Sequence, residues 1–368
     1  MNPTFPGRRR ALLGAVVATA VLAVAQPGRA LTINTTYSAS VNNLANAAEV
    51  KAAFQGAIAV YQNMFANPVT INLQVGWGEL LGSPVTSLGV AGMTGFGTYN
   101  YSQMQTMLRA TATSVSDQTA YANFAATSPI GTGTFTLTPA LAKAIGVAGA
   151  SSAIDGYIGF GAGYSFDLNR ADGITAGSYD FHGVALHEIS HVLGRVSGLG
   201  FNGATNGLAI DLFRYKAPGS TSFTYNEAAS FSIDGGRTML AAFNAAGTAD
   251  RDSWVSMPGD AFSAYAAPGV VNDLSAADRI VMDVLGWNTV MGSTSPTYTT
   301  PTTPTTTTSS GGGKGKPSRR SQEDSGFAVA APATDVPEPA SMALLTSALI
   351  GLGAVSRRRR TIAPQAST

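Results

Sequence analysis

Cysteine is absent from the 368 residues, which excludes disulfide bonds, a thiolate nucleophile and a cysteine-ligated metal. Histidine is almost as scarce, with three residues, and charged residues make up only 12% of the chain. Glycine is abundant at 42 residues, and 45% of the residues are hydrophobic. This composition is typical of a turn-rich extracellular globular protein that is stabilised by burial rather than by cross-links.

The small net charge of +1 hides an uneven distribution of charge along the chain. Residues 31–292 contain 17 acidic against 10 basic residues, a net charge of −7. Most of the remaining basic residues form two terminal clusters, Arg8–Arg10 and Arg357–Arg360. An acidic folded part disfavours nucleic acid as a partner, so none is expected, and the basic ends are better explained as targeting signals.

The N-terminus has the three parts of a secretory signal peptide. Arg8–Arg10 is followed by the apolar stretch Ala11–Ala25, and small residues suited to cleavage end at Ala25 and Ala30. We therefore predict that residues 1–30 direct export. The alternatives left open are the Sec or the twin-arginine route, and an uncleaved N-terminal anchor.

Residues 31–292 have the mixed character of one domain, which is large enough to bury a full core. Apolar residues at helical spacing predict a helix over residues 44–65, and alternation predicts a strand over 69–75. A second strand is expected at 153–160 and a further helix at 181–194. This order of elements predicts an α+β fold.

The composition changes abruptly after this domain. Residues 293–335 are rich in Thr, Pro, Ser and Gly, which predicts a flexible linker because such a sequence buries no core. The apolar run Met342–Val355 follows and is closed by Arg357–Arg360. About 14 residues give a helix of roughly 21 Å, which is shorter than a bilayer core. A short membrane anchor or a transient stop is therefore expected, with residues 361–368 beyond it.

The order Val336-Pro337-Glu338-Pro339, apolar helix and Arg cluster resembles the PEP-CTERM sorting tail of Gram-negative bacteria that produce exopolysaccharide. The resemblance covers residues 336–360. It implies processing by an exosortase, contact with the membrane only through the C-terminal helix, and a final place at the cell surface or outside the cell. A plain C-terminal anchor is the alternative.

All three histidines lie within ten residues, in a segment that predicts a helix capped by Asp180. His187 and His191 are four residues apart, so their imidazoles project from one helical face, as two zinc ligands on one rigid element require. Glu188 lies one residue after the first histidine, within reach of a water on the metal. His-Glu-x-x-His is the zinc-protease signature. His182 points away around the helix and is not expected to be a ligand.

The pattern predicts the chemistry of a zinc (Zn²⁺) metallopeptidase. The metal would activate a water and polarise the scissile carbonyl of a peptide or protein substrate, and Glu188 would act as general base. The alternative for the motif is an ordinary helix with two histidines that bind nothing.

The third metal ligand is not fixed by the motif. Ser197 stands where a metzincin-like pattern would place a further His or Asp, and no histidine follows His191. A carboxylate, or else a tyrosine, must complete the site. Asp211 is the first choice because its charge lies inside an apolar run, although a salt bridge to Arg214 would also explain it. The remaining candidates are Asp250 and Asp252, followed by Glu227 and Asp234.

With the histidine motif, the segments Asp211–Tyr215, Phe231–Gly236 and Asp273–Trp287 resemble a PEP-CTERM-associated family of zinc metalloproteases. The resemblance spans most of residues 60–290. It implies a zincin-like fold, with a twisted mixed sheet over the active-site helix. A non-catalytic exported surface or matrix protein associated with exopolysaccharide is the alternative function. Glycan hydrolysis finds no support, since no acidic pair lies in an aromatic context.

Overall fold

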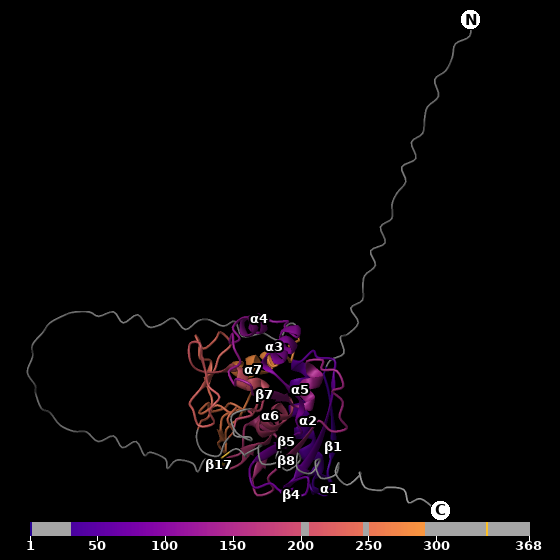
Figure 1. The fold of residues 1–368 in the computed structure, drawn as a ribbon. Helices are drawn as coiled ribbons and strands as arrows, with labels where there is room; N and C mark the ends of the chain where they lie inside the picture. The colour runs from indigo at the N-terminus through magenta and orange to yellow at the C-terminus, as the bar shows by residue number, and fades with distance from the viewer. Residues whose placement is uncertain (2–30, 200–205, 246–249, 291–335, 338–368) are drawn as a thin grey trace, which may run out of the picture.

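The computed structural model describes residue 1 and residues 31–199, 206–245, 250–290 and 336–337 (Figure 1). The helices in this part are α1 (Ala39–Asn42), α2 (Ala47–Met64), α3 (Tyr101–Ala110), α4 (Val115–Ala122), α5 (Pro139–Ala144), α6 (Phe181–Val192) and α7 (Ala276–Val284), with 3-10 turns η1 (Arg170–Asp172) and η2 (Ala209–Phe213). The strands are β1 (Thr32–Tyr37), β2 (Thr70–Trp77), β3 (Glu79–Leu80), β4 (Ser83–Pro84), β5 (Gly89–Gly92), β6 (Phe96–Tyr99), β7 (Thr134–Leu137), β8 (Gly156–Phe160), β9 (Phe166–Asp167), β10 (Tyr179–Asp180), β11 (Asn206–Gly207), β12 (Arg214–Ala217), β13 (Ser220–Thr221), β14 (Ser230–Phe231), β15 (Ala241–Ala242), β16 (Tyr265–Ala266) and β17 (Val336–Pro337).

The central sheet has the strand order β1-β2-β8-β5 and is mixed. β1, β2 and β8 run parallel, with Thr32 opposite Thr70 and Leu73 opposite Gly156. β5 runs antiparallel to β8 and forms one edge, with Gly89 opposite Phe160. The smaller sheets β11-β7-β6 and β13-β12-β14-β15 come from later parts of the same domain.

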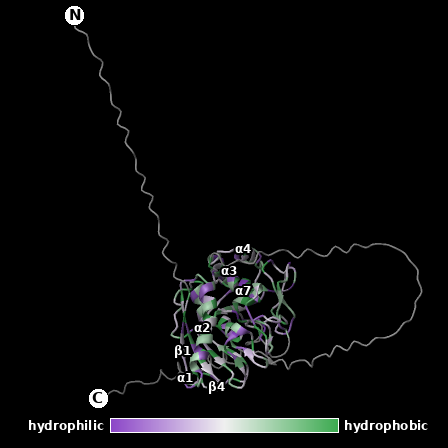
Figure 2. Ribbon diagram, turned by 180° about the vertical axis from the view of Figure 1, so that it is seen from behind, coloured by the Kyte–Doolittle hydropathy of each residue, from purple (hydrophilic) through white to green (hydrophobic). Residues whose placement is uncertain are grey.

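Helix α2 connects the parallel strands β1 and β2 and packs against α6 (Figure 1). Its buried side chains recur at helical spacing, as expected for an amphipathic helix. Figure 2 shows both hydrophobic and hydrophilic residues along this helix. Tyr61 lies within this buried face and donates its hydroxyl to the backbone oxygen of Leu186, at 2.7 Å. The hydrogen bond fixes α2 to the middle of α6.

Helix α6 also lies against β5 and β8, so it sits between the central sheet and the rest of the domain. Gly156 of β8 makes this approach possible. A Cβ atom at that position would lie 2.4 Å from Cγ1 of Val192, so a larger residue would push the end of the helix away. Trp287 holds the same end by donating its indole N–H to the backbone oxygen of Leu193, at 2.8 Å.

The elements predicted from the sequence are present with small shifts of their ends. The helix expected at 44–65 is α2, the strands expected at 69–75 and 153–160 are β2 and β8, and the helix expected at 181–194 is α6. The sequence did not predict β1 or β5, which complete the central sheet. Residues 2–30 of the expected signal peptide, residues 293–335 of the linker and residues 338–368 of the tail lie outside the described residues.

Within the described residues, no helix is long and apolar enough to cross a membrane. The apolar run of residues 342–355 is not part of that description.

Two buried carboxylates, Asp117 of α4 and Asp283 of α7, lie where these two helices pack together. Asp283 of α7 is 2% exposed and accepts a hydrogen bond from the hydroxyl of Ser114, at 2.5 Å. Ser114 also caps α4, where its oxygen accepts the amide of Asp117. Burial, together with the charge of Asp117, raises the pKa of Asp283 to about 7.

We predict that Asp283→Asn stabilises the protein at alkaline pH. In wild type the folded state binds more protons than the unfolded state between about pH 4 and 7, so the free energy of unfolding falls as the pH rises through this window. Asparagine keeps an acceptor for Ser114 without the buried charge. The gain should be on the order of 2 kcal/mol at pH 8 and vanish near pH 4, measured by urea unfolding at each pH.

Asp167→Asn serves as the control with the opposite sign. The hydroxyl and amide of Thr175 donate to the Asp167 carboxylate and lower its pKa, so this variant should lose stability at pH 8. A change in stability for Asp283→Asn that is the same at every pH would contradict the prediction.

Candidate metal centre

Helix α6 carries the histidine motif through the interior of the domain. Asp180 caps the start of the helix: its side-chain carboxylate accepts the backbone amide of His182 at 3.1 Å. Every residue from Gly183 to Val192 is buried. The predicted helix and its cap are confirmed, and the two histidines that follow are 0% exposed.

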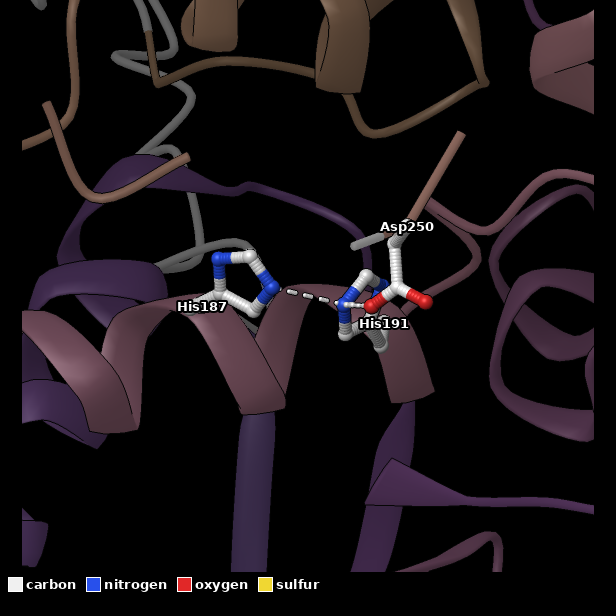
Figure 3. A group of neighbouring side chains, drawn as sticks. All are labelled: His187, His191 and Asp250. Atoms are coloured by element: carbon white, nitrogen blue, oxygen red, sulfur yellow. Dashed lines mark hydrogen bonds and ion pairs between the residues drawn. The ribbon is translucent and has the colours of Figure 1, made fainter. Parts of the chain in front are cut away.

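The imidazoles of His187 and His191 converge on one point (Figure 3). Their Nε2 atoms are 2.8 Å apart. Nδ1 of His187 lies 2.8 Å from the backbone oxygen of Ala261, and Nδ1 of His191 lies 2.7 Å from that of Arg195. A carbonyl oxygen can only accept, so each Nδ1 carries the hydrogen. In the neutral rings both Nε2 lone pairs are therefore directed at each other.

Two lone pairs at 2.8 Å repel each other unless something positive lies between them. A shared proton or a metal ion removes the repulsion. Neutral imidazole with a free Nε2 is the form in which histidine binds metals, and the backbone carbonyls on Nδ1 are the partners that fix this tautomer. The ring orientations therefore fit a cation.

Asp250 completes the group. Its Oδ2 atom lies 3.3 Å from Nε2 of His191, and the residue as a whole is 5% exposed. Among the described residues, His187, His191 and Asp250 form the one group whose ligand atoms all lie within 4.8 Å of one another. Tetrahedral zinc at its usual bond lengths separates neighbouring ligand atoms by about 3.3 Å, so small adjustments suffice.

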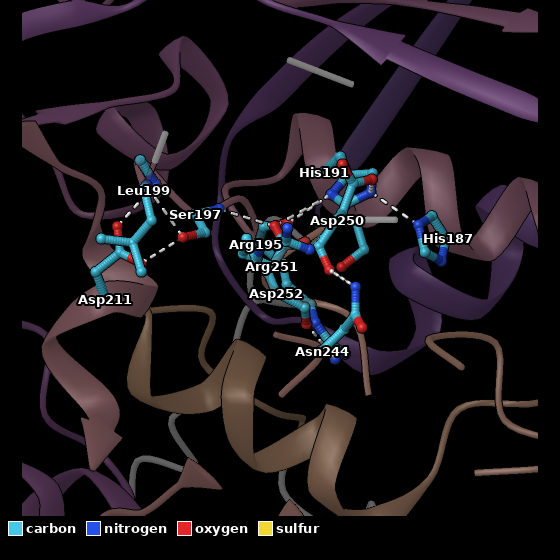
Figure 4. A network of polar contacts seen from close by, with 12 residues as sticks. His187, His191, Arg195, Ser197, Leu199, Asp211, Asn244, Asp250, Arg251 and Asp252 are labelled. Atoms are coloured by element: carbon cyan, nitrogen blue, oxygen red, sulfur yellow. Dashed lines mark hydrogen bonds and ion pairs between the residues drawn. The ribbon is translucent and has the colours of Figure 1, made fainter. Parts of the chain in front are cut away.

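The structure does not bring Asp211, the first choice for the third ligand, into this group, and its carboxylate lies elsewhere (Figure 4). Its carboxylate accepts the hydroxyl of Ser197 at 2.6 Å and the amides of Gly198 and Leu208 at 2.7 and 2.9 Å. The buried charge in the apolar run thus stabilises the turn after α6 and the start of η2. Ser197 also serves this turn and is not placed as a ligand.

The other acidic candidates also have structural partners. Asp252 accepts the amide of Ser197 at 2.8 Å and lies 3.6 Å from Nδ1 of His191, on the far side of the ring from Nε2. Glu227 pairs with Lys216 at 2.7 Å. Asp234 caps its own turn by accepting the amide of Thr238. Asp250 was among the sequence candidates. It could not be ranked first, because it lies far along the chain from the helix and no motif spacing links it to the two histidines.

The electrostatics of the site favour a positive charge. Burial lowers the pKa of His187 well below its usual value, and the neighbouring His191 lowers it further. For His191, burial alone would lower the pKa, but the charges of Asp252, Asp250 and Glu188 outweigh it and raise the pKa to about 10. The acidic groups that hold a proton on His191 would attract a divalent cation as well.

Glu188 follows the first histidine and is also 0% exposed. Its side chain lies against the edge strand β5, where a Cβ atom on Gly89 would come within 2.5 Å of Oε1. His182 is half-buried and lies beside Gly56 of α2, outside the group, as expected. Burial lowers its pKa, and the charge of Arg170 adds to this.

We predict that Asp250→Ala and Asp211→Ala separate metal binding from folding. Asp250→Ala should lower the affinity for Zn²⁺ by at least about 100-fold with little loss of stability, because it removes a ligand. Asp211→Ala should retain the metal but lose on the order of 2–4 kcal/mol of stability, because it leaves buried donors without an acceptor. Metal content per chain and urea unfolding of the purified full chain measure the two effects.

Equal zinc affinity in wild type and Asp250→Ala would contradict this assignment. Loss of zinc in a folded Asp211→Ala variant would restore the original choice.

The family described as PEP-CTERM protein-sorting motif matches residues 335–360. The match confirms the sorting tail predicted for residues 336–360 and implies recognition by exosortase sorting machinery. Comparison with curated proteins found no match, and comparison with solved structures found none. The chain is therefore an exported protein, sorted to the cell envelope, that carries a PEP-CTERM motif at its C-terminus.

Proposed function

We propose that the chain is an exported zinc metallopeptidase whose metal is held by His187, His191 and Asp250. The observation that carries this proposal is the convergence of the Nε2 nitrogens of two imidazoles, 2.8 Å apart, with a carboxylate oxygen 3.3 Å from one of them. Two histidines and one carboxylate are the donor set of many hydrolytic zinc sites. The residues present fit the metal in donor type and in tautomer, with each Nδ1 committed to a backbone oxygen.

Bound zinc would supply Lewis-acid chemistry that makes water a nucleophile near neutral pH. Glu188 then takes the role of general base, because it follows His187 directly on the helix. It is also close enough to His191 for its negative charge to help raise the pKa of that ring. It would accept the proton of the attacking water and return it to the leaving amine. The backbone of Gly89 lies close enough to Glu188 to limit the positions of its carboxylate.

The packing of α6 against the mixed central sheet supports the zincin-like fold. β5 is antiparallel to its neighbour, lies at the edge of the sheet and contacts α6 beside Glu188. The predicted twisted mixed sheet over an active-site helix, in one catalytic domain at residues 31–292, is in keeping with this packing. Within the proposal, the substrate is a peptide or protein outside the cell or at its surface, and the C-terminal helix anchors the chain in the membrane only until exosortase processing.

The depth of the site has a mechanistic consequence. His187 and His191 are fully buried and Asp250 is 5% exposed, so a peptide reaches them only after the covering residues move. Hydrolysis thus requires an opening step before chemistry. The same burial favours a second candidate function, a non-catalytic exported surface or matrix protein in which the metal only stabilises the fold.

Glu188→Gln distinguishes the two functions. We expect hydrolysis of a mixed peptide library to fall by about 10²–10⁴-fold, because glutamine cannot accept the proton. Zinc content and thermal stability should stay close to wild type, since the side chain is not a ligand. Wild-type protein that contains one zinc per chain and cleaves no peptide would refute the peptidase and favour the non-catalytic function.

Gly89→Ala tests the place of Glu188 without changing it. The added methyl group would come within 2.8 Å of Cγ of Glu188 and displace the carboxylate. We expect kcat to fall by about 10²-fold, as for small misplacements of catalytic groups, while zinc affinity is retained. Gly163→Ala is the control, because no other group lies within 4 Å of the added atom. Unchanged kcat in Gly89→Ala would argue against Glu188 as the base.

A further inference from the structure

A buried stack of planar groups runs from the first histidine into the domain. The Phe262 ring lies parallel to the imidazole of His187, with centroids 4.6 Å apart and planes at 19°. The guanidinium carbon of Arg195 lies 3.4 Å from the centroid of the Phe262 ring and 4.5 Å from that of Trp254. Two groups so close to one ring cannot share a face, so Phe262 is held between His187 and Arg195.

The guanidinium group of Arg195 is also held by hydrogen bonds from its edge. Arg195 is 0% exposed and donates from Nη1 to the Asp278 carboxylate and from Nη2 to the backbone oxygen of Asp252, the latter at 3.3 Å. The indole N–H of Trp254 donates to the same carboxylate at 2.8 Å. Asp278 in turn caps α7 by accepting the amide of Ser275. A planar fork that stacks and donates in this way cannot be replaced by an ammonium group.

The main chain of the same residue reaches the second histidine. The backbone oxygen of Arg195 accepts Nδ1–H of His191 at 2.7 Å, and the amide of Arg195 donates to the backbone oxygen of Ser190 at 3.0 Å. The side chain of Arg195 therefore helps to fix the orientation of the His187 ring, because both groups stack on Phe262. Its carbonyl sets the tautomer and the direction of His191.

We propose that Arg195 is the positioning residue of the metal centre, because it orients both histidine ligands at once without touching the metal. This inference rests on the proposed metal site. Outer-shell partners of metal-bound histidines commonly change metal affinity by 10–100-fold when mutated. The arrangement predicts that the guanidinium plane, rather than its charge alone, sets the affinity.

The test uses Co²⁺ binding to the full chain, because cobalt reports both affinity and ligand geometry through its visible absorption. Arg195→Lys keeps the charge and loses the stacking plane and the fork. We expect it to weaken Co²⁺ and Zn²⁺ binding by about 10–100-fold and to alter the cobalt absorption band, under conditions where circular dichroism shows the variant fully folded. A merely structural role would lower stability and leave affinity and spectrum unchanged.

Phe262→Leu is the second variant and keeps the test informative if Arg195→Lys does not fold. It retains an apolar side chain but removes the ring between Arg195 and His187, and the same loss of affinity is expected. Phe135→Leu is its matched control. That ring is 1% exposed and packs with Tyr101 and Phe223, so the substitution should lower stability and change affinity by less than about twofold.

The outcomes separate the two proposals. If the wild type does not bind Co²⁺ or Zn²⁺ stoichiometrically, the metal centre itself is refuted. If the wild type binds and both folded variants bind with wild-type affinity and spectrum, the positioning role of Arg195 is refuted and the metal centre stands.

Discussion

Two hydrogen bonds from imidazole to backbone carbonyl determine what this site can be. Because the oxygens of Ala261 and Arg195 can only accept, the Nδ1 atoms of His187 and His191 are donors, and both Nε2 atoms are left facing each other at 2.8 Å. Such a pair is repulsive in the neutral state unless a proton or a metal ion is shared. The carboxylate of Asp250 beside it adds an anionic oxygen at 3.3 Å and gives the pair the donors of a zinc site.

The remainder of the domain holds this pair in place. Tyr61 fixes α6 from α2, Gly156 allows the helix to lie close to β8, and Trp287 holds the backbone at its end. Arg195 begins a second layer of contacts that reaches Asp278 on α7. Helices α2 and α7, from early and late parts of the sequence, are therefore both tied to the residues around the histidine pair, and both imidazoles are fully buried.

Sequence patterns predicted the features that depend on neighbouring residues, such as helices and their caps. The spacing of His187 and His191, the cap at Asp180 and the apolar stripe of α2 all follow from helical periodicity, and the structure agrees. Asp211 was ranked first as a ligand, but an acidic residue in an apolar run signals only that its charge needs partners. The partners are the hydroxyl of Ser197 and two backbone amides, which no sequence pattern specifies.

Zinc K-edge X-ray absorption of the full chain, purified with its metal, tests the account most directly. The account predicts one zinc per chain with two imidazole nitrogens and a carboxylate oxygen among ligands at about 2.0–2.2 Å. A zinc shell built of oxygen ligands without imidazole, or a folded chain that takes up no zinc at all, would contradict it.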